Sequence, residues 1–282
     1  MPACLLAFDT STDQTAAALL APGGPWLLNE AGGALASTRL IPALMGLLAR
    51  AGITLADVQA IGFGQGPGAF TGLRTACAVA QGLALARDTP VLALDSLLVV
   101  ADDAMNDGLN DGLSNGLSMG LNTALTDSPA SPLPSAANGA QALGAVPAPL
   151  ATAPWWVAMD ARMDEVYAAC YQHGAAGWRV VVEPRLWTLA ALSAAWSANP
   201  PVRVAGSAVT AFADRLPWGD AQTRPQCSNR AAALGRLAQA AWAQGRAIAA
   251  DQALPVYLRD KVALTTAERA ALRALAACSP AP

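Results

Sequence analysis

Apolar residues in the first part of the chain alternate between short runs of strand length and longer stretches of helical spacing. A short apolar run bounded by turn residues is typical of a buried strand, whereas recurrence at i, i+3, i+4 and i+7 indicates a helix. Strands are predicted at residues 5–8, 15–20, 26–29, 60–63 and 91–94. Helices are predicted at residues 40–51, at 71–87 and from residue 96 onward. This alternation favours an α/β domain.

Residues 106–153 have a different pattern. Glycine followed by leucine recurs at every fourth position from Gly108 to Gly120, and the part after Asp127 is rich in Pro, Ala and Ser. Glycine costs a helix about 1 kcal/mol at each interior position, and a strand has no period of four. We interpret this stretch as a flexible insertion between two domains, residues 1–105 and 154–282.

The second domain repeats the pattern of the first. Strands are predicted at residues 155–159, 166–171, 178–182 and 202–205, and helices at 189–196, 207–216 and 229–247. Residues 7–13 align with residues 158–164, which places Asp9 on Asp160 and Asp13 on Asp164. An internal repeat decides the architecture of a chain.

Each half therefore opens with a strand, an acidic turn and two further strands. This is the plan of the superfamily of actin and sugar kinases, in which the two turns face each other across a nucleotide cleft. We expect an α/β fold of duplicated actin-like (ASKHA, ribonuclease H-like) subdomains, with mixed sheets flanked by helices.

Composition narrows the function classes. Hydrophobic residues make up 54% and charged residues 13%, which excludes a largely disordered chain. The net charge of −3 gives no basic surface for gripping nucleic acid. Lys261 is the only lysine and His173 the only histidine, so enzymes that need a histidine pair or a phosphate-binding lysine are disfavoured. We expect His173, beside a turn, to lie at the surface.

The cysteines form neither a disulfide framework nor a zinc site. They are five in number, widely spaced and without a Cys-x-x-Cys pair. The start of the chain has no basic segment followed by a long apolar one, and apolar runs are shorter than the ~20 residues of a spanning helix. We expect a soluble cytoplasmic protein with no membrane segment.

The first acidic turn offers candidate nucleotide-binding residues: Asp9, Thr10 and Ser11. Hydroxyl and backbone N–H groups after a strand can bind phosphate, and an aspartate can hold Mg²⁺ through water. The alternative is an ordinary hairpin turn closed by Asp, Ser and Thr side chains. In the second turn, Asp160, Asp164 and Glu165 allow a metal site, but a solvated turn is the simpler interpretation.

The glycine-rich segment 64–74 has two open interpretations. Its glycines and Thr71 could present backbone N–H groups to an anion at the start of a helix. They could equally allow a helix to pack closely on a sheet or on another chain. The segment is neither a P-loop, which ends in Gly-Lys-Ser/Thr, nor a Gly-x-Gly-x-x-Gly fingerprint.

Several segments together resemble the TsaB (YeaZ) family. They are residues 5–12, 66–74, 80–84, 157–167 and 255–259. The resemblance covers the chain except the insertion. It implies an actin-like fold and a non-catalytic subunit that binds and activates the TsaD paralogue, with the ATPase TsaE. That complex transfers a threonylcarbamoyl group to N6 of the adenosine next to the anticodon, in tRNAs reading codons that begin with A.

The resemblance also implies where the chemistry lies. No catalytic residue and no metal ligand is predicted in this chain, and no cofactor of its own; ATP and a metal are expected in the partner complex. TsaD holds its metal with two histidines one helical turn apart, and residues 36–42 here contain none. The chain is expected to form a homodimer when alone and to meet tRNA only through the complex.

The partner interface is predicted on two helices. Its residues are Leu40, Leu44, Leu47, Phe70, Thr71, Leu73, Arg74, Val79 and Leu83. The alternative is that the apolar members only cover the sheet of their own domain. A second function, an active ATP-dependent phosphotransferase or ATPase of the actin-like superfamily, stays open. A peptidase is disfavoured because the histidine pair is missing.

Overall fold

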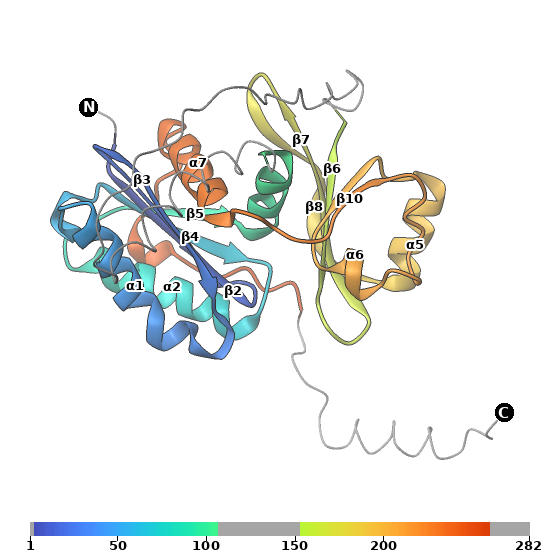
Figure 1. Ribbon diagram of the computed structural model, residues 1–282, viewed down its shortest axis with the longest axis horizontal. Coiled ribbons are helices and arrows are strands. Elements are labelled where there is room, and N and C mark those ends of the chain that lie inside the picture. The colour runs from blue at the N-terminus through green and yellow to red at the C-terminus, as the bar shows by residue number, and fades with distance from the viewer. Residues whose placement is uncertain (1–2, 107–152, 260–282) are drawn as a thin grey trace, which may run out of the picture.

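The computed structural model describes residues 3–106 and 153–259, which build two five-stranded sheets (Figure 1). In the first sheet the order is β3-β2-β1-β4-β5. Its strands are β1 (Leu5–Asp9), β2 (Gln14–Ala21), β3 (Gly24–Ala31), β4 (Ala60–Gly66) and β5 (Val91–Asp95). In the second sheet the order is β10-β9-β6-β7-β8. Its strands are β6 (Trp155–Asp160), β7 (Glu165–Gly174), β8 (Gly177–Thr188), β9 (Arg203–Ala205) and β10 (Gln222–Arg224).

The two sheets have the same topology. β1 pairs antiparallel with β2 and parallel with β4, and β6 pairs antiparallel with β7 and parallel with β9. Asp9 and Asp160, which the sequence aligns, are the last residues of the two equivalent strands β1 and β6. The predicted fold class, duplicated subdomains with mixed sheets flanked by helices, is confirmed.

Helices cover both sheets. The α-helices are α1 (Ala36–Arg50), α2 (Phe70–Leu85), α5 (Leu189–Ala198), α6 (Ala208–Ala211) and α7 (Arg230–Ala243). A further helix spans 96–106. The short 3₁₀ helices are Gly33–Leu35, Leu55–Asp57 and Ala250–Gln252. Within the described residues, no helix is long and apolar enough to cross a membrane.

Each helix has one sheet face to cover. α1 and α2 share one apolar cluster with the first sheet, and α7 covers the opposite face although it follows the second sheet in the chain (Figure 1). α5 and α6 cover the outer face of the second sheet. The helix at 96–106 packs against both sheets, because Val99 lies in the core of the first and Val100 in that of the second.

Several predicted boundaries were wrong. α6 ends at Ala211 rather than at residue 216, because Phe212 leaves helical geometry (φ −128°, ψ 34°). Phe212 and Leu216 are nevertheless both buried, which explains why their spacing imitates a helix. α7 ends at Ala243 rather than at residue 247, since Gly245 takes a left-handed turn conformation (φ 66°). β10 was not predicted, and the predicted insertion at 106–153 lies almost entirely outside the described residues.

One half-buried carboxyl group joins the two sheets. Asp95, at the end of β5, accepts a 2.5 Å hydrogen bond from the hydroxyl of Tyr171 on β7. Its other oxygen accepts the N–H of Leu97 at 2.9 Å and so caps the helix at 96–106. Burial raises the pKa of Asp95 to about 6, and the hydrogen bonds offset only part of this shift. The contact between the sheets is therefore sensitive to the ionisation of one group.

We predict that Asp95 makes the protein less stable as pH rises. Its pKa is higher in the folded chain than the ordinary 3.8, so the ionised form is disfavoured in the fold. The free energy of unfolding should fall by roughly 2–3 kcal/mol as pH rises from about 4 to about 6, and then level off. Asp95→Asn should remove this slope in denaturant titrations across that range. The exposed Asp220→Asn serves as control and should keep it; parallel curves for wild type and Asp95→Asn would contradict the prediction.

Candidate functional site

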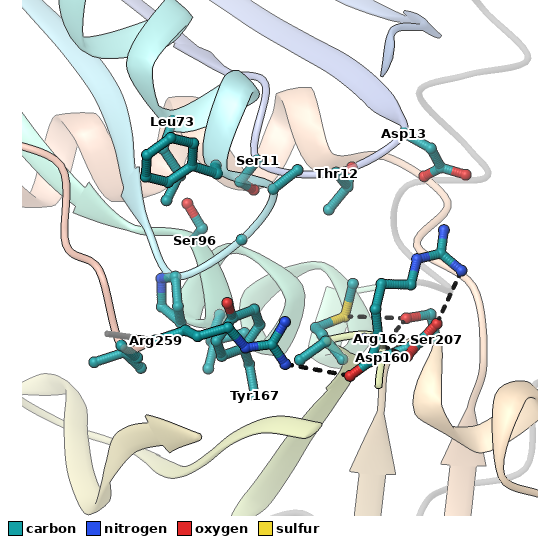
Figure 2. Close-up of a pocket in the computed structure, with 18 of the residues that line it drawn as sticks. Ser11, Thr12, Asp13, Leu73, Ser96, Asp160, Arg162, Tyr167, Ser207 and Arg259 are labelled. Carbon is teal, nitrogen blue, oxygen red and sulfur yellow. Dashed lines mark hydrogen bonds and ion pairs between the residues drawn. The ribbon is translucent and has the colours of Figure 1, made fainter. Parts of the chain in front are cut away.

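A cavity of about 680 Å³ lies between the two halves of the molecule, where the two acidic turns face each other (Figure 2). Ser11, Thr12 and Asp13 of the β1–β2 turn line one side. Asp160 and Arg162 of the β6–β7 turn line the other, together with residues from the helix at 96–106 and from the end of the described chain. The arrangement of two turns across a cleft is the one that the sequence repeat predicts.

The first turn holds the carboxylate of Asp9 away from the cavity. Asp9 is fully buried, and its Oδ1 accepts the N–H of Ser11 at 2.5 Å. Its Oδ2 lies 3.0 Å from a guanidinium nitrogen of Arg230, whose side chain is 2% exposed. Thr10 is also buried, and of the three predicted nucleotide-binding residues only Ser11 lines the cavity.

The carboxylates of the second turn also meet arginines. Asp160 lies 3.2 Å from Arg162, and Asp164 lies 2.7 Å from Arg215, which lowers the pKa of the Asp164 carboxyl. Glu165 pairs with the guanidinium of Arg259.

No cluster of three potential metal ligands occurs within residues 3–106 and 153–259. The backbone of the second turn is strained, since Arg162, Met163 and Asp164 have φ values of 65°, 57° and 57°.

The glycine-rich segment packs against the first turn. A Cβ atom at Gly72 would lie 1.8 Å from the backbone oxygen of Thr10, and one at Gly68 would lie 2.4 Å from that of Ser11. The Ala69 N–H donates to the Ser11 oxygen at 2.7 Å, and the Thr10 hydroxyl donates to the Gly72 oxygen at 2.7 Å. The geometry favours close packing over anion binding, because these groups already bond to one another.

The end of the described chain links the two halves. The Val256 N–H donates to the Gln65 oxygen at 2.7 Å, which ties this segment to β4 of the first sheet. Arg259 then donates to the backbone oxygen of Arg162 at 3.2 Å and to the carboxylate of Glu165, both in the second turn. The segment thus forms part of the cavity wall, a position that the sequence motif at 255–259 did not predict.

An aromatic contact holds the same segment onto α2. The ring of Tyr257 lies 4.9 Å from that of Phe70, and the guanidinium of Arg74 lies 3.8 Å over the Phe70 ring. Arg74 Nε also donates to the Tyr257 hydroxyl at 3.1 Å. Two predicted interface residues, Phe70 and Arg74, are therefore engaged within the chain.

The other predicted interface residues divide between core and surface. Leu40, Leu44, Leu47 and Leu73 are buried in the first subdomain, which is the alternative that the sequence left open. Val79 and Leu83 are half-buried, and Thr71 is exposed. Exposed apolar residues that the prediction missed are Leu35, Ile41, Met45 and Leu85. On α1 the signal was present as a second apolar stripe, one position beyond the buried one.

Known proteins resemble this chain along most of its length. A family model described as "TsaD: tRNA N6-adenosine threonylcarbamoyltransferase" matches residues 34–111. The "tRNA threonylcarbamoyladenosine biosynthesis protein TsaB" of Haemophilus influenzae is 41% identical over 100 residues, covering 36% of this chain and 42% of that protein. The Escherichia coli protein of the same name is 27% identical over 275 residues, 92% of this chain and 96% of that protein. The solved structure of YeaZ from Pseudomonas aeruginosa has a TM-score of 0.68 and 33% identity, covering 91% of this chain and all of that one.

We predict opposite effects for two glycine substitutions in α2. Gly72→Ala should destabilise the fold by roughly 3 kcal/mol, because the new Cβ meets the Thr10 backbone and the turn must move. Gly82→Ala is the matched control, since a Cβ there meets nothing within 4 Å. It should leave stability unchanged or raise it by up to about 1 kcal/mol through helix propensity. Chemical denaturation measures both, and equal stabilities would show that the contact between α2 and the turn is not tight.

Proposed function

The chain belongs to the TsaB (YeaZ) family of tRNA threonylcarbamoyladenosine biosynthesis proteins, and from this premise we propose that it acts as a non-catalytic partner subunit. In this proposal it binds and activates a TsaD paralogue, which transfers the threonylcarbamoyl group to N6 of the adenosine next to the anticodon. TsaE completes the complex. ATP and the metal belong to these partners, and tRNA is bound through the complex.

The observation that carries the proposal is an apolar surface on α1 and α2, which we call the helix surface. It comprises the exposed residues Ile41 and Met45 of α1, Leu85 of α2, and Leu35 just before α1. Ile41 is 46% exposed and Leu85 72% exposed. Both helices cover the same face of the first sheet, so their outer sides point away from it together (Figure 1). Exposed apolar side chains on the outer sides of two neighbouring helices are typical of a protein–protein interface.

Small residues on the same outer sides support helix-to-helix contact. A Cβ at Gly46 of α1 or at Gly82 of α2 would meet nothing within 4 Å, so packing within this chain does not require glycine at either position. Glycine there leaves room for a partner backbone to approach. The TsaD family model matches residues 34–111, the part of the chain that contains α1 and α2. A TsaD-like partner would therefore offer equivalent helices, and a second copy of this chain would compete for the same surface.

The non-catalytic role is supported by the ion pairs that carboxylates of the two acidic turns form with arginines. The actin-like fold implies a Mg²⁺-nucleotide at the first turn, but the carboxylate that would hold the ion contacts Arg230 instead. The carboxylates of the second turn likewise contact arginines. The residues present therefore do not fit Mg²⁺-nucleotide, which disfavours the alternative of an active phosphotransferase or ATPase.

We predict that charge on the helix surface abolishes the complex. The double variant Ile41→Glu, Met45→Glu should bind the TsaD paralogue at least tenfold more weakly, because two carboxylates would have to be buried in the interface. Light scattering of the mixed proteins measures this. Val180→Glu is the control, since Val180 is 43% exposed on β8 of the other subdomain and should bind as wild type does. Equal binding by the double variant and the control would refute the proposed surface.

A reconstituted modification assay tests the function itself. The partners should modify tRNA efficiently only when this chain is added, and the double variant should fail to stimulate them. The chain alone should turn over no nucleotide. Turnover by the purified chain that is lost in Asp9→Asn would instead establish the phosphotransferase or ATPase alternative.

A further inference from the structure

We infer that Arg230 is a built-in cation of the β1–β2 turn, which occupies the turn in place of a Mg²⁺-nucleotide and holds it in one conformation. The inference concerns the interior of the first subdomain and does not depend on the partner. Four observations carry it: the contacts of Arg230, the way its backbone is fixed, the enclosure of Asp9, and the continuity of the turn with α2.

The guanidinium of Arg230 is surrounded by the turn. Beside the ion pair with Asp9, it donates to the hydroxyl of Thr12 at 2.6 Å and to that of Ser11 at 3.2 Å. A third contact reaches the backbone oxygen of Gln14 at 3.5 Å. The group therefore contacts the hydroxyls and the carboxylate that a phosphate and its cation would need.

The backbone of Arg230 is fixed by the first subdomain and the helix at 96–106. Arg230 is the first residue of α7, and Asn229 caps this helix by accepting the N–H of Ala232 at 3.1 Å. The N–H of Asn229 donates to Asp103 at 3.0 Å, and Asn29 of β3 accepts the N–H of Ala231 at 3.0 Å. With its start held from two sides, α7 directs the guanidinium into the turn.

Asp9 has no room for a second cation. The backbone of Gly64 on β4 lies so close that a Cβ there would be 2.3 Å from the carboxyl carbon of Asp9. A Mg²⁺ ion needs six oxygen ligands at about 2.1 Å and keeps several waters. With Gly64 on one side and Arg230 on the other, the pair is closed to a hydrated ion. Without Arg230, a fully buried carboxylate would have no compensating charge.

The turn passes this constraint to α2. Ser11 and Thr10 lie between Arg230 and the glycine-rich segment, through the bonds to Ala69 and Gly72. Arg230 is therefore a positioning residue: it acts on the start of α2 through the turn and touches no reacting group.

Chemical rescue tests the inference. Arg230→Ala should melt roughly 10 °C below wild type, because it leaves the Asp9 charge uncompensated. Guanidinium ion, added far below denaturing concentration, should restore at least half of the loss, whereas an equal concentration of NaCl should not. Arg246→Ala is the control, because it removes an exposed arginine after α7. Neither guanidinium ion nor NaCl should change its melting temperature. A purely structural loss of packing would not be repaired by the free ion, so failure of rescue overturns the inference.

Two further measurements test the same inference if Arg230→Ala does not fold. In the first, Mg²⁺-ATP should leave the melting temperature of wild type unchanged, and a saturable rise would show that the turn takes a nucleotide. In the second, the double variant Asp9→Asn, Arg230→Met should have a higher melting temperature than Arg230→Met alone, because it no longer carries the uncompensated charge of Asp9. Additive losses would show that the two side chains are not coupled. Either contrary result leaves the proposed partner surface untouched.

Discussion

The ion pair between Asp9 and Arg230 is the constraint on which the arrangement of the chain depends. Both side chains are buried, and a buried charge is tolerated only when an opposite charge and hydrogen bonds compensate it. Arg230 follows the entire second sheet in the sequence, so the pair forms only if the chain returns to the first sheet as α7. α7 then covers β1 and β2 on the face opposite α1 and α2. The first subdomain is therefore complete only after the second has been built.

The same topology is compatible with catalysis or with its absence, and the side chains around the turns decide which. A hairpin that leaves its aspartate open to the cleft can hold a metal. Here Asp9 of the first turn contacts Arg230 of α7, and Asp160, Asp164 and Glu165 of the second turn contact arginines from three different segments. The glycines beside the first turn serve packing for the same reason, since the groups that would bind an anion bond to Thr10 and Ser11 instead.

The sequence predicted the fold because the information was local. Strand-length apolar runs, two aligned acidic turns and helical spacing each depend on neighbouring residues, and the structure confirms the duplicated plan. The orientation of α1 was harder, since Leu40 and Leu44 form one apolar stripe and Ile41 and Met45 another. Periodicity alone does not show which stripe meets the sheet. The stripe that contains Leu40 and Leu44 is buried because β2 and α2 pack against it.

The site depends on long-range pairing that no local pattern contains. Nothing around Asp9 indicates that its partner is an arginine from the distant helix α7. The role of Gly72 was equally hidden. It follows from the 1.8 Å that would separate a Cβ atom at this position from the Thr10 oxygen, and glycine spacing alone does not reveal that contact. The sequence motifs therefore point to segments that line the cavity, but they leave the chemistry of these segments undecided.

α2 is the element through which the cleft and the helix surface are connected. Its first residue, Phe70, lines the cavity and contacts Tyr257, while Gly72 rests directly on the turn that Arg230 holds. Farther along the same helix, Leu85 belongs to the helix surface. A tightly packed helix moves as a nearly rigid body when the residues at one of its ends are displaced. Because the backbone of Gly72 is in close contact with that of Thr10, a shift of the turn would shift α2 as a whole. The buried pair thus sets the position of the surface proposed to meet the partner, which gives Asp9 a structural role at a distance from that surface.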